Sequence, residues 1–309
     1  MTRHNTPRVS FIGFGEAGQA IASGLREEGI ERIAAWDILF PVPEGARLKA
    51  AGESMGVRLA SSAAEAVRDI DLIVSAVTAA SSFEAARSVV DNLAGNPYYL
   101  DINSVSPGRK QATAKLLEGR ARYIDVAVIA PIHPARHKTP LLIAGPHAEA
   151  ISPLLRELEM QLTVVGPDTG QAAAIKMIRS VMIKGIEALT LECFLAAARA
   201  GVLEEVTASL KNNYPTLDFT KIADYNLERM ASHGERRAAE MEESAATLRE
   251  LGLDPLMVDA TVARQREMGA IGKNDSVRAT LKSGRAAMLK AISAAAKIGT
   301  SKSSPIIPT

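Results

Sequence analysis

Short apolar runs alternate with alanine-rich segments of helical periodicity in the first half of the chain, from residue 8 to about residue 165. This alternation predicts an α/β domain with a doubly wound parallel sheet, in which helices connect successive strands. The expected strands are Arg8–Phe14, Glu31–Asp37, Asp71–Val77, Tyr98–Asn103, Tyr123–Val128, Leu141–Ala144 and Leu162–Val165. The expected helices include Glu16–Glu28, Ser81–Asp91, Ser106–Leu117 and Glu149–Glu159.

From residue 168 onward the hydrophobic pattern is helical. The segment from Thr169 to about Ala200 follows a Gly-Pro-Asp turn and contains no proline, which predicts one long helix. Further helices are expected at Glu204–Asn212, Asp218–Met230, Glu235–Leu251 and Pro255–Met268. We therefore expect a first domain over residues 1–167, an all-α second domain over residues 168–298 and a flexible tail over residues 299–309.

Composition narrows the class of protein. The 309 residues carry 36 basic and 35 acidic side chains, so no overall electrostatic field attracts nucleic acid or an anionic membrane. No apolar run reaches the roughly 18 residues that a membrane span needs. The single cysteine, Cys193, cannot form an internal disulfide, and it lies in an apolar run where we expect it to be buried. These features predict a cytoplasmic protein without nucleic-acid or membrane partners.

The strongest motif is a Gly-x-Gly-x-x-Gly turn at Gly13, Gly15 and Gly18, which follows an apolar strand and opens a helix. In such a turn the first glycine permits a tight bend, the second lets a pyrophosphate approach the backbone, and the third lets the helix pack on the strand. This context predicts a Rossmann-type dinucleotide-binding first domain. The expected contacts to the dinucleotide are Gly13, Phe14, Gly15, Glu16, Ala17 and Gly18.

An acidic residue and two polar strand ends extend the predicted site. Asp37 lies 19 residues after Gly18, where a carboxylate accepts hydrogen bonds from the adenosine ribose and repels the extra phosphate of NADP. NAD is therefore the expected cofactor, with NADP less favoured. The next strand ends supply candidate contacts to ribose and nicotinamide or, alternatively, helix caps: Val77, Thr78, Asn103 and Ser104.

The predicted long helix carries two cations on an otherwise apolar surface. Spacings of three, four and seven residues place four side chains on one helical face: Lys176, Arg179, Ser180 and Ile183. Such cations are costly to bury unless a ligand or an acidic partner meets them. The alternative is a pair of long side chains that extend to solvent at a domain boundary.

Four features follow one another along the chain: the glycine turn, Asp37, the strand end from Asn103 to Pro107, and the segment from Gly170 to Lys176. In this order they resemble the β-hydroxyacid dehydrogenases and 6-phosphogluconate dehydrogenases. The resemblance extends to about residue 185. It implies a Rossmann domain followed by an all-α domain that is entered by a long helix. It also implies that Lys176 is the general acid/base that acts on the substrate hydroxyl.

Three departures from the family pattern affect the substrate. Asp125 leads into Val126 to Pro131 rather than into the usual Asp-x-Pro-x-Ser-Gly-Gly substrate loop. Ser180 stands where an asparagine is usual, and Ile183 stands where the phosphogluconate enzymes have an acidic residue. The expected substrate is therefore neither 6-phosphogluconate nor an ordinary acid of the 3-hydroxyisobutyrate type.

The segment that replaces the usual loop, from Pro131 to Lys138, is rich in basic residues. His133 and Arg136 are candidates for a cationic wall that faces an anionic substrate, and a solvated loop is the alternative. We expect no metal here, because Pro134 argues against a continuous helix and no nearby acid completes a ligand set.

In the second domain, His233, Arg236 and Arg237 share one face if the helix continues through Gly234, a geometry suited to a carboxylate or phosphate. Glu240 lies on the same stripe, so a salt-bridged surface helix is the alternative. This segment resembles the C-terminal module of a phosphogluconate-dehydrogenase-like subgroup of unassigned substrate.

Together these features predict an NAD-dependent oxidoreductase that transfers a hydride between nicotinamide and a small polar hydroxy acid, with Lys176 as general acid/base. The candidate contacts to this small anionic substrate are Ser104, His133, Arg136, Arg179, Ser180, His233, Arg236 and Arg237. We expect a homodimer formed through the all-α domain, which would bury its long helix against a second copy. Two alternatives remain: an imine or ketone reductase on the same scaffold, and a catalytically silent dinucleotide sensor.

Overall fold

The computed structural model describes residues 6–296, so the predicted tail over residues 299–309 lies outside the described residues. Contacts within the chain divide it into two compact units. Of the described residues, the first unit holds 6–179 and 246–254, and we call it the sheet unit. The second holds 180–245 and 255–296, and we call it the helical unit. The division falls within the long helix rather than at its start.

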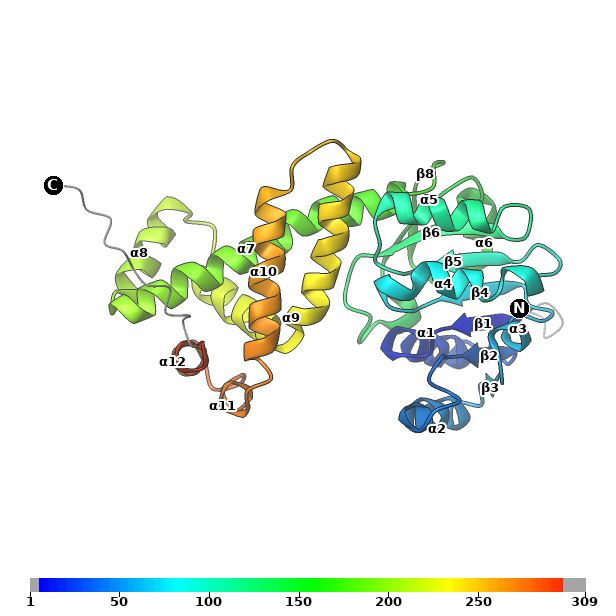
Figure 1. Cartoon of the computed structure of the whole chain (residues 1–309), viewed down its shortest axis with the longest axis horizontal. Helices are drawn as coiled ribbons and strands as arrows, with labels where there is room; N and C mark the ends of the chain where they lie inside the picture. Colours follow the sequence, from blue (N-terminus) through cyan, green and yellow to red (C-terminus); the bar gives the residue numbers. More distant parts are fainter. Residues whose placement is uncertain (1–5, 297–309) are drawn as a thin grey trace. The chain divides into compact units, whose positions relative to one another are not determined.

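The sheet unit is built on eight strands in the order β3-β2-β1-β4-β5-β6-β7-β8 (Figure 1). The strands are β1 (Val9–Ile12), β2 (Ile33–Trp36), β3 (Arg58–Leu59), β4 (Leu72–Ser75), β5 (Tyr98–Asp101), β6 (Arg122–Val128), β7 (Leu141–Ala144) and β8 (Leu162–Gly166). All seven predicted strands are present, and the short edge strand β3 is an addition. The doubly wound α/β fold that the sequence predicts is confirmed.

One pair of strands departs from the expected parallel arrangement. β7 runs antiparallel to β6, with Asp125 opposite Ala144, whereas the other neighbouring strands are parallel. The connection between β6 and β7 contains only the one-turn 3-10 helix η4 (Arg136–Lys138). A parallel return usually crosses the sheet through an α-helix. This connection has no α-helix, and the chain returns antiparallel.

Helices cover both faces of the sheet. The helices of this unit are α1 (Glu16–Glu27), α2 (Ala46–Ser54), α3 (Ala63–Ala66), α4 (Ser82–Arg87), α5 (Pro107–Leu116) and α6 (Ala148–Glu157), with 3-10 turns η1 (Pro43–Gly45), η2 (Ala79–Ser81) and η3 (Val90–Asn92). Residues of α1 and α6 join Phe11 in one core, and residues of α3 and α4 join Ile12 in the other. Because both faces are covered, the central strands read as continuous apolar runs.

The helical unit contains no strand among its described residues. Its elements are the greater part of α7 (Gln171–Ala200), then α8 (Leu203–Asn213), most of α9 (Phe219–Glu250), α10 (Leu256–Ile271), α11 (Asp275–Arg278) and α12 (Arg285–Ala295). Phe194, Met230 and Leu289 lie at the centre of its apolar core. The predicted long helix is present. Within residues 6–296, every helix is too short or too polar to span a lipid bilayer.

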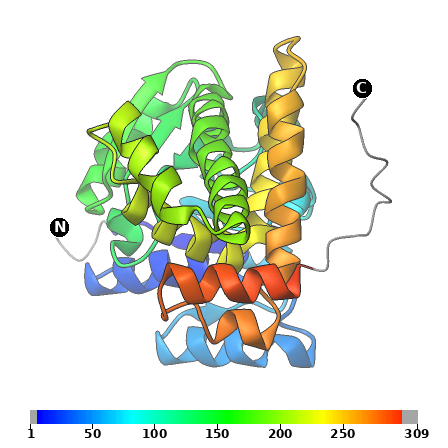
Figure 2. The same cartoon turned by 90° about the vertical axis from the view of Figure 1, so that its left-hand side faces the viewer.

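The prediction of two helices on either side of Gly234 is wrong, because α9 runs unbroken through that glycine. A Cβ at Gly234 would lie 2.4 Å from both the carbonyl oxygen of Gln265 and the amide nitrogen of Gly269. The glycine therefore allows α9 and α10 to pack with their backbones close together, side by side as in Figure 2. Gly234, which the sequence suggests as a break between two helices, is instead the point where α9 contacts α10.

The expected burial of Cys193 is also wrong. Leu191 and Phe194 point into the core and are only 1% exposed, whereas Cys193 is exposed. The apolar run around Cys193 is longer than one face of a helix, so some of its members must face outward. Met182 and Leu189 are likewise 64% and 59% exposed. α7 therefore presents apolar side chains on a surface of the helical unit.

Candidate active site

The glycine turn after β1 is shaped by three different contacts. Gly13 has φ of +90°, and a Cβ there would lie 2.4 Å from the carbonyl oxygen of Ala76. A Cβ at Gly18 would lie 2.6 Å from the carbonyl oxygen of Gly13, so the start of α1 packs directly on the turn. At Gly15, by contrast, no atom lies within 4 Å of the added Cβ. The first and third glycines are required by the fold, and the second leaves space open to a ligand.

This open space lies at the N-terminus of α1. Gly15 is the N-cap residue, and no side chain caps the helix. The first amide groups of a helix have no partner inside the helix, and the helix dipole favours an anion there. The turn therefore fits a pyrophosphate. Phe14 contributes only its backbone, because its ring is buried against Phe11 and Phe40 with ring centroids 6.2 Å apart.

Asp37 follows β2 and is fixed against the glycine turn. Its Oδ2 accepts a hydrogen bond from the Phe14 amide at 2.7 Å, and its Oδ1 accepts one from the Leu39 amide at 2.9 Å. Each carboxylate oxygen has room for a second donor. The next basic residue along the chain is Arg47, so the intervening segment offers no cation to a ribose phosphate.

The ends of β4 and β5 are joined by the side chain of Asn103, which is buried. Its Oδ1 accepts a hydrogen bond from the Val77 amide at 2.7 Å, and its Nδ2 donates to Ser75 Oγ and to Asp101 Oδ1. Asn103 is thus neither a helix cap nor an exposed side chain. Thr78 is exposed at the N-cap position of η2, where its hydroxyl bonds the Ser81 hydroxyl at 3.0 Å.

Lys176 and Ser104 meet in the sheet unit. Lys176 lies in the second turn of α7, and Ser104 follows β5. The Nζ of Lys176 donates a hydrogen bond to the Oγ of Ser104 at 2.6 Å, and both residues are half-buried. Strand carboxyl ends are the usual ligand edge of a parallel sheet. The pair therefore places an amine that can carry a proton at the edge where ligands bind.

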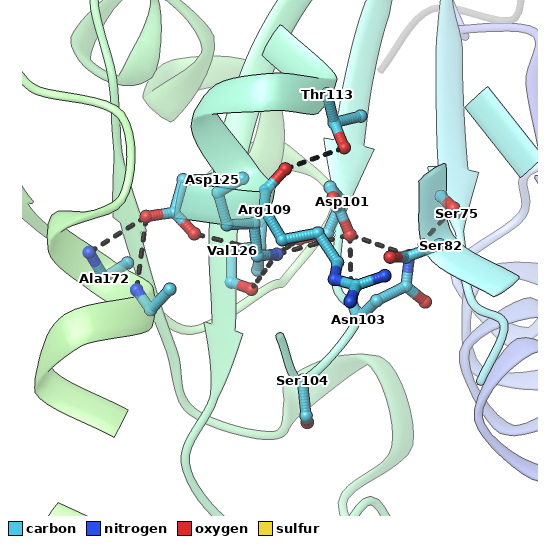
Figure 3. Close-up of polar contacts among 12 residues, drawn as sticks. Ser75, Ser82, Asp101, Asn103, Ser104, Arg109, Thr113, Asp125, Val126 and Ala172 are labelled. Carbon is cyan, nitrogen blue, oxygen red and sulfur yellow. Dashed lines mark hydrogen bonds and ion pairs between the residues drawn. The ribbon is translucent and has the colours of Figure 1, made fainter. Parts of the chain in front are cut away.

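A buried charge cluster lies beside this pair, and Figure 3 shows its two carboxylates, Asp101 and Asp125. The Oδ2 of Asp125 accepts hydrogen bonds from the amides of Gly170, Ala172 and Ala173, which begin α7, at 3.0 to 3.2 Å. Lys110 Nζ lies 3.2 Å from Asp101 Oδ1 and 3.6 Å from Asp125 Oδ1. The two carboxylates and the ammonium are all 1% exposed or less.

Burial raises the pKa of Asp125, while the charge of Lys110 and the helix amides oppose that rise. Tyr123 donates its hydroxyl proton to Asp101 Oδ2 at 2.8 Å, and burial raises the pKa of this phenol too. Sequence reasoning did not identify Lys110 or Asp101. A signal was available, because Asp101 and Asp125 fall on adjacent predicted strands and two buried carboxylates side by side require a cation.

Arg136 and Lys138, two basic side chains of the segment over residues 131–138, pair with acids at the end of α1. Arg136 makes a two-bonded ion pair with Glu27, and Lys138 pairs with Glu28 at 2.8 Å. Glu27 is eleven residues beyond the start of α1, about 16 Å along the helix from the glycine turn. Arg136 is therefore held at the far end of α1 by an acid that the prediction did not consider. His133 is exposed.

The predicted stripe on α7 divides into two environments. Ser180 is buried and accepts a hydrogen bond from Lys184 Nζ at 3.2 Å, while Arg179 and Ile183 are exposed. Lys184 also lies 2.9 Å from Glu240. Ser180 and Lys184, four residues apart, lie on the buried side of α7. Arg179 and Ile183, each one position earlier in the chain, face solvent.

The cations expected on α9 also separate. Arg237 is buried, and its guanidinium is bonded to Glu187, which accepts a further hydrogen bond from Gln265 Nε2 at 2.9 Å. Its charge is thus neutralised inside the helical unit. His233 is half-buried, with its pKa lowered by burial, and Arg236 is exposed. Among residues 6–296, no three His, Cys, Asp or Glu side chains are placed to hold a metal ion.

Comparison with known proteins agrees with this architecture. Residues 8–103 match the family described as NADP oxidoreductase, coenzyme F420-dependent, and residues 197–268 match a domain of unknown function, DUF1932. A conserved hypothetical protein from Sinorhizobium meliloti 1021 is 35% identical with a TM-score of 0.77, over 94% of this chain and 97% of that one. A second conserved protein of unknown function is 29% identical with a TM-score of 0.67, over 85% and 97% of the two chains.

That second structure is described as similar to 3-hydroxyacid dehydrogenases. The chain belongs to the β-hydroxyacid dehydrogenase superfamily. The fold is shared with the 3-hydroxyisobutyrate dehydrogenase of Mycobacterium tuberculosis, whose structure includes L-serine, at 14% identity and a TM-score of 0.70 over 86% and 94% of the chains. An imine reductase from Myxococcus stipitatus shares it at 22% identity and a TM-score of 0.57, over 93% and 99%. Family and fold together indicate an NAD(P)-dependent oxidoreductase of unassigned substrate.

Proposed function

We propose that this protein is an NAD-dependent dehydrogenase that interconverts a small polar hydroxy acid and its keto form, with Lys176 as general acid/base. The observation that carries the proposal is the 2.6 Å hydrogen bond between Lys176 Nζ and Ser104 Oγ at the carboxyl edge of the sheet. The open glycine turn lies along the same edge, after β1. An amine held beside the place where a dinucleotide ends suits proton transfer to or from a substrate oxygen.

The residues present fit a dinucleotide. The amides at the N-terminus of α1 and the space at Gly15 would hold the pyrophosphate, and Asp37 would accept hydrogen bonds from the adenosine ribose. When bound, NAD supplies the hydride acceptor. A carboxylate at Asp37, with no basic residue before Arg47, supports NAD over NADP.

Lys176 would carry the proton in both directions. In oxidation, the substrate hydroxyl gives its proton to the neutral amine of Lys176, the C–H bond at the same carbon breaks as a hydride leaves, and a C=O bond forms. In reduction, the ammonium of Lys176 returns the proton to that oxygen. Ser104 accepts a hydrogen bond from Lys176, so it would orient Nζ toward the substrate.

We assign the substrate carboxylate to fewer cationic residues than the sequence analysis predicts. Arg136 makes an ion pair with Glu27, and the buried Arg237 makes one with Glu187. Arg179, His233 and Arg236 stay our candidates for the anion contact, with Arg179 and Arg236 exposed. Arginine suits a carboxylate because its planar head donates two parallel hydrogen bonds.

We also propose a homodimer formed through α7. Met182, Ile186 and Leu189 recur at intervals of three and four residues on that helix and are 42% to 64% exposed. Apolar side chains in such a row favour association with a matching surface. A symmetric pair would bury this row against its own copy.

An absorbance assay at the NADH band, run over a panel of hydroxy acids, tests the function. The result expected is NADH formation with the wild-type chain and its loss in Lys176→Met. The fold shared with an imine reductase makes the reverse screen, NADH oxidation with cyclic imines and ketones, the test of the alternative. A dinucleotide sensor would bind NAD without turnover in either screen.

A further inference from the structure

Lys110 lies on the side of α5 that faces the sheet and is 1% exposed. Its Nζ donates to the carbonyl oxygens of Asp101 at 2.5 Å and Val126 at 3.3 Å, besides its two ion pairs. One ammonium therefore contacts both β5 and β6. Two polar connections lead from this ammonium to the two members of the Lys176–Ser104 pair.

The first connection runs through Asp125. Its Oδ1 faces Lys110, and its Oδ2 holds the amides of Gly170, Ala172 and Ala173. Gly170 directly precedes α7, Ala172 and Ala173 lie in its first turn, and Lys176 lies one turn further along. The position of the Asp125 carboxylate thereby sets where α7 starts relative to β6, and so where the stem of Lys176 begins.

The second connection runs through Asp101. Its Oδ1 faces Lys110 and also accepts hydrogen bonds from the backbone amide of Asn103 at 3.0 Å and from its side chain at 2.7 Å. Ser104 follows Asn103 directly. Figure 3 shows Asp101 turned toward Asn103 and Asp125 turned toward Ala172, on opposite sides of the cluster. The Asp101 carboxylate therefore fixes the backbone that presents Ser104.

The charges explain why a lysine is needed at this position. Two buried carboxylates stand against one ammonium and the start of α7, which carries about half a positive charge. Without the ammonium the two carboxylates repel each other at low dielectric. This repulsion acts to separate the ends of β5 and β6, which carry them. Any separation changes the distance between Lys176 and Ser104.

We propose that Lys110 is a positioning residue that holds Lys176 and Ser104 in register by bridging Asp101 and Asp125. The inference rests on the proposed function only in giving the Lys176–Ser104 pair a catalytic meaning. Lys110 itself is enclosed in the core and does not touch the substrate. Its role is to keep the proton carrier and its hydrogen-bond partner at their 2.6 Å separation.

The test is trace acetylation of the full-length chain with acetic anhydride at neutral pH, with the modification of Lys176 quantified by mass spectrometry. In Lys110→Met, Lys176 should be acetylated about tenfold faster than in the wild type, because it loses a hydrogen bond made by a charged donor. Lys115→Met is the matched control, since Lys115 is exposed on the same helix. That variant should leave the rate at Lys176 unchanged.

Binding of ADP-ribose separates a positioning role from general damage. ADP-ribose would contact the glycine turn, which follows β1, and Asp37, which follows β2, whereas the cluster lies on β5 and β6. Its affinity should stay at the wild-type level in Lys110→Met while the acetylation rate of Lys176 rises. An unchanged acetylation rate in a variant that still binds ADP-ribose overturns the proposal.

A second variant covers the case in which Lys110→Met does not fold. Asp125→Asn keeps the shape of the side chain and an oxygen for the amides of α7, but it removes the charge that faces Lys110. It should also raise the acetylation rate of Lys176, and a rate equal to the wild type in folded Asp125→Asn contradicts the proposal. If Lys176→Met retains full turnover while these acetylation rates rise, the proposed function fails and the positioning role stands. If Lys176→Met loses turnover while the acetylation rates stay at the wild-type level, the positioning role fails and the proposed function stands.

Discussion

Lys176 donates a hydrogen bond to Ser104 across 2.6 Å, although 72 residues separate the two along the chain. Ser104 is presented by the end of β5, and Lys176 by the second turn of α7. Asp125, on the strand beside β5, binds the amides at the start of α7. The geometry of the proposed acid/base thus depends on how β5, β6 and α7 are joined.

Replacing Lys176 with methionine keeps most of the volume of the side chain and removes the proton carrier. Once a substrate is found, kcat should fall by about 100-fold to 10,000-fold, the range typical of the loss of a general acid/base. NAD affinity should change little. Quenching of the fluorescence of Trp36, the only tryptophan and the neighbour of Asp37, reports that affinity. Wild-type turnover in folded Lys176→Met would assign the proton transfer to another group.

The cofactor preference should depend on the charge of Asp37. The variant Asp37→Asn keeps an oxygen acceptor for only one of the Phe14 and Leu39 amides, and it removes the negative charge that would face a ribose phosphate. The wild type should bind NAD more tightly than NADP, and the variant should narrow that difference mainly by binding NADP better. Titration of Trp36 fluorescence with each dinucleotide measures both affinities. Tighter binding of NADP by the wild type would reverse the assignment.

The stability of Lys110→Met should depend on pH in a definite direction. Burial raises the pKa of Asp125 above its unfolded value, so the associated stability is present at low pH and is lost as pH rises through the folded pKa. The charge of Lys110 lowers that pKa, so its removal moves the loss to higher pH. At pH 7 the variant should lose about 3–5 kcal/mol of unfolding free energy, the usual cost of breaking a buried ion pair.

Urea denaturation at pH 7 and pH 5 measures this effect, and the loss should be smaller at pH 5. Lys115→Met, in which an exposed lysine of the same helix is removed, should show little loss at either pH. An equal loss for Lys110→Met at both pH values would mean that the lysine contributes packing rather than charge.

Two glycines on long helices should respond in opposite ways to replacement by alanine. At Gly234 the new Cβ would meet Gly269 and Gln265 at 2.4 Å, so Gly234→Ala should lower the free energy of unfolding by about 1–3 kcal/mol. At Gly185, in α7, nothing lies within 4 Å, so Gly185→Ala should raise it by about 1 kcal/mol through helix propensity. Thermal melts compare the two. Equal stability of Gly234→Ala and the wild type would show that α9 and α10 can separate without cost.

The sequence predicts the elements of this fold well because each strand of a doubly wound sheet is a continuous apolar run bounded by helices. The same logic identifies the glycine turn and Asp37, whose spacing is local. It does not identify partners that are distant in sequence: Arg136 is paired with Glu27, 109 residues away, and no local pattern indicates this. Lys110 is missed for the same reason, since its neighbours in sequence resemble any solvated helix start.

Dimerisation through α7 can be tested with residues that the chain already provides. Leu189 is 59% exposed on α7, and Leu253, outside the helical unit, is 58% exposed. Leu189→Lys places a charge on the proposed interface and should convert the dimer to a monomer in sedimentation velocity, because a charge buried without a partner is costly. Leu253→Lys, which changes the same residue type at equal exposure, should leave the dimer intact.

Cys193 gives an independent measure of the same interface. It is the only cysteine and is exposed on α7, four residues beyond Leu189 and so on the same face of the helix. In a symmetric dimer the face around Cys193 meets a copy of itself, so a short bis-maleimide should link two chains at concentrations where Leu189→Lys gives no linked product. Equal cross-linking of the wild type and Leu189→Lys, together with a monomeric wild type in sedimentation, would place the exposed face of α7 outside any dimer interface.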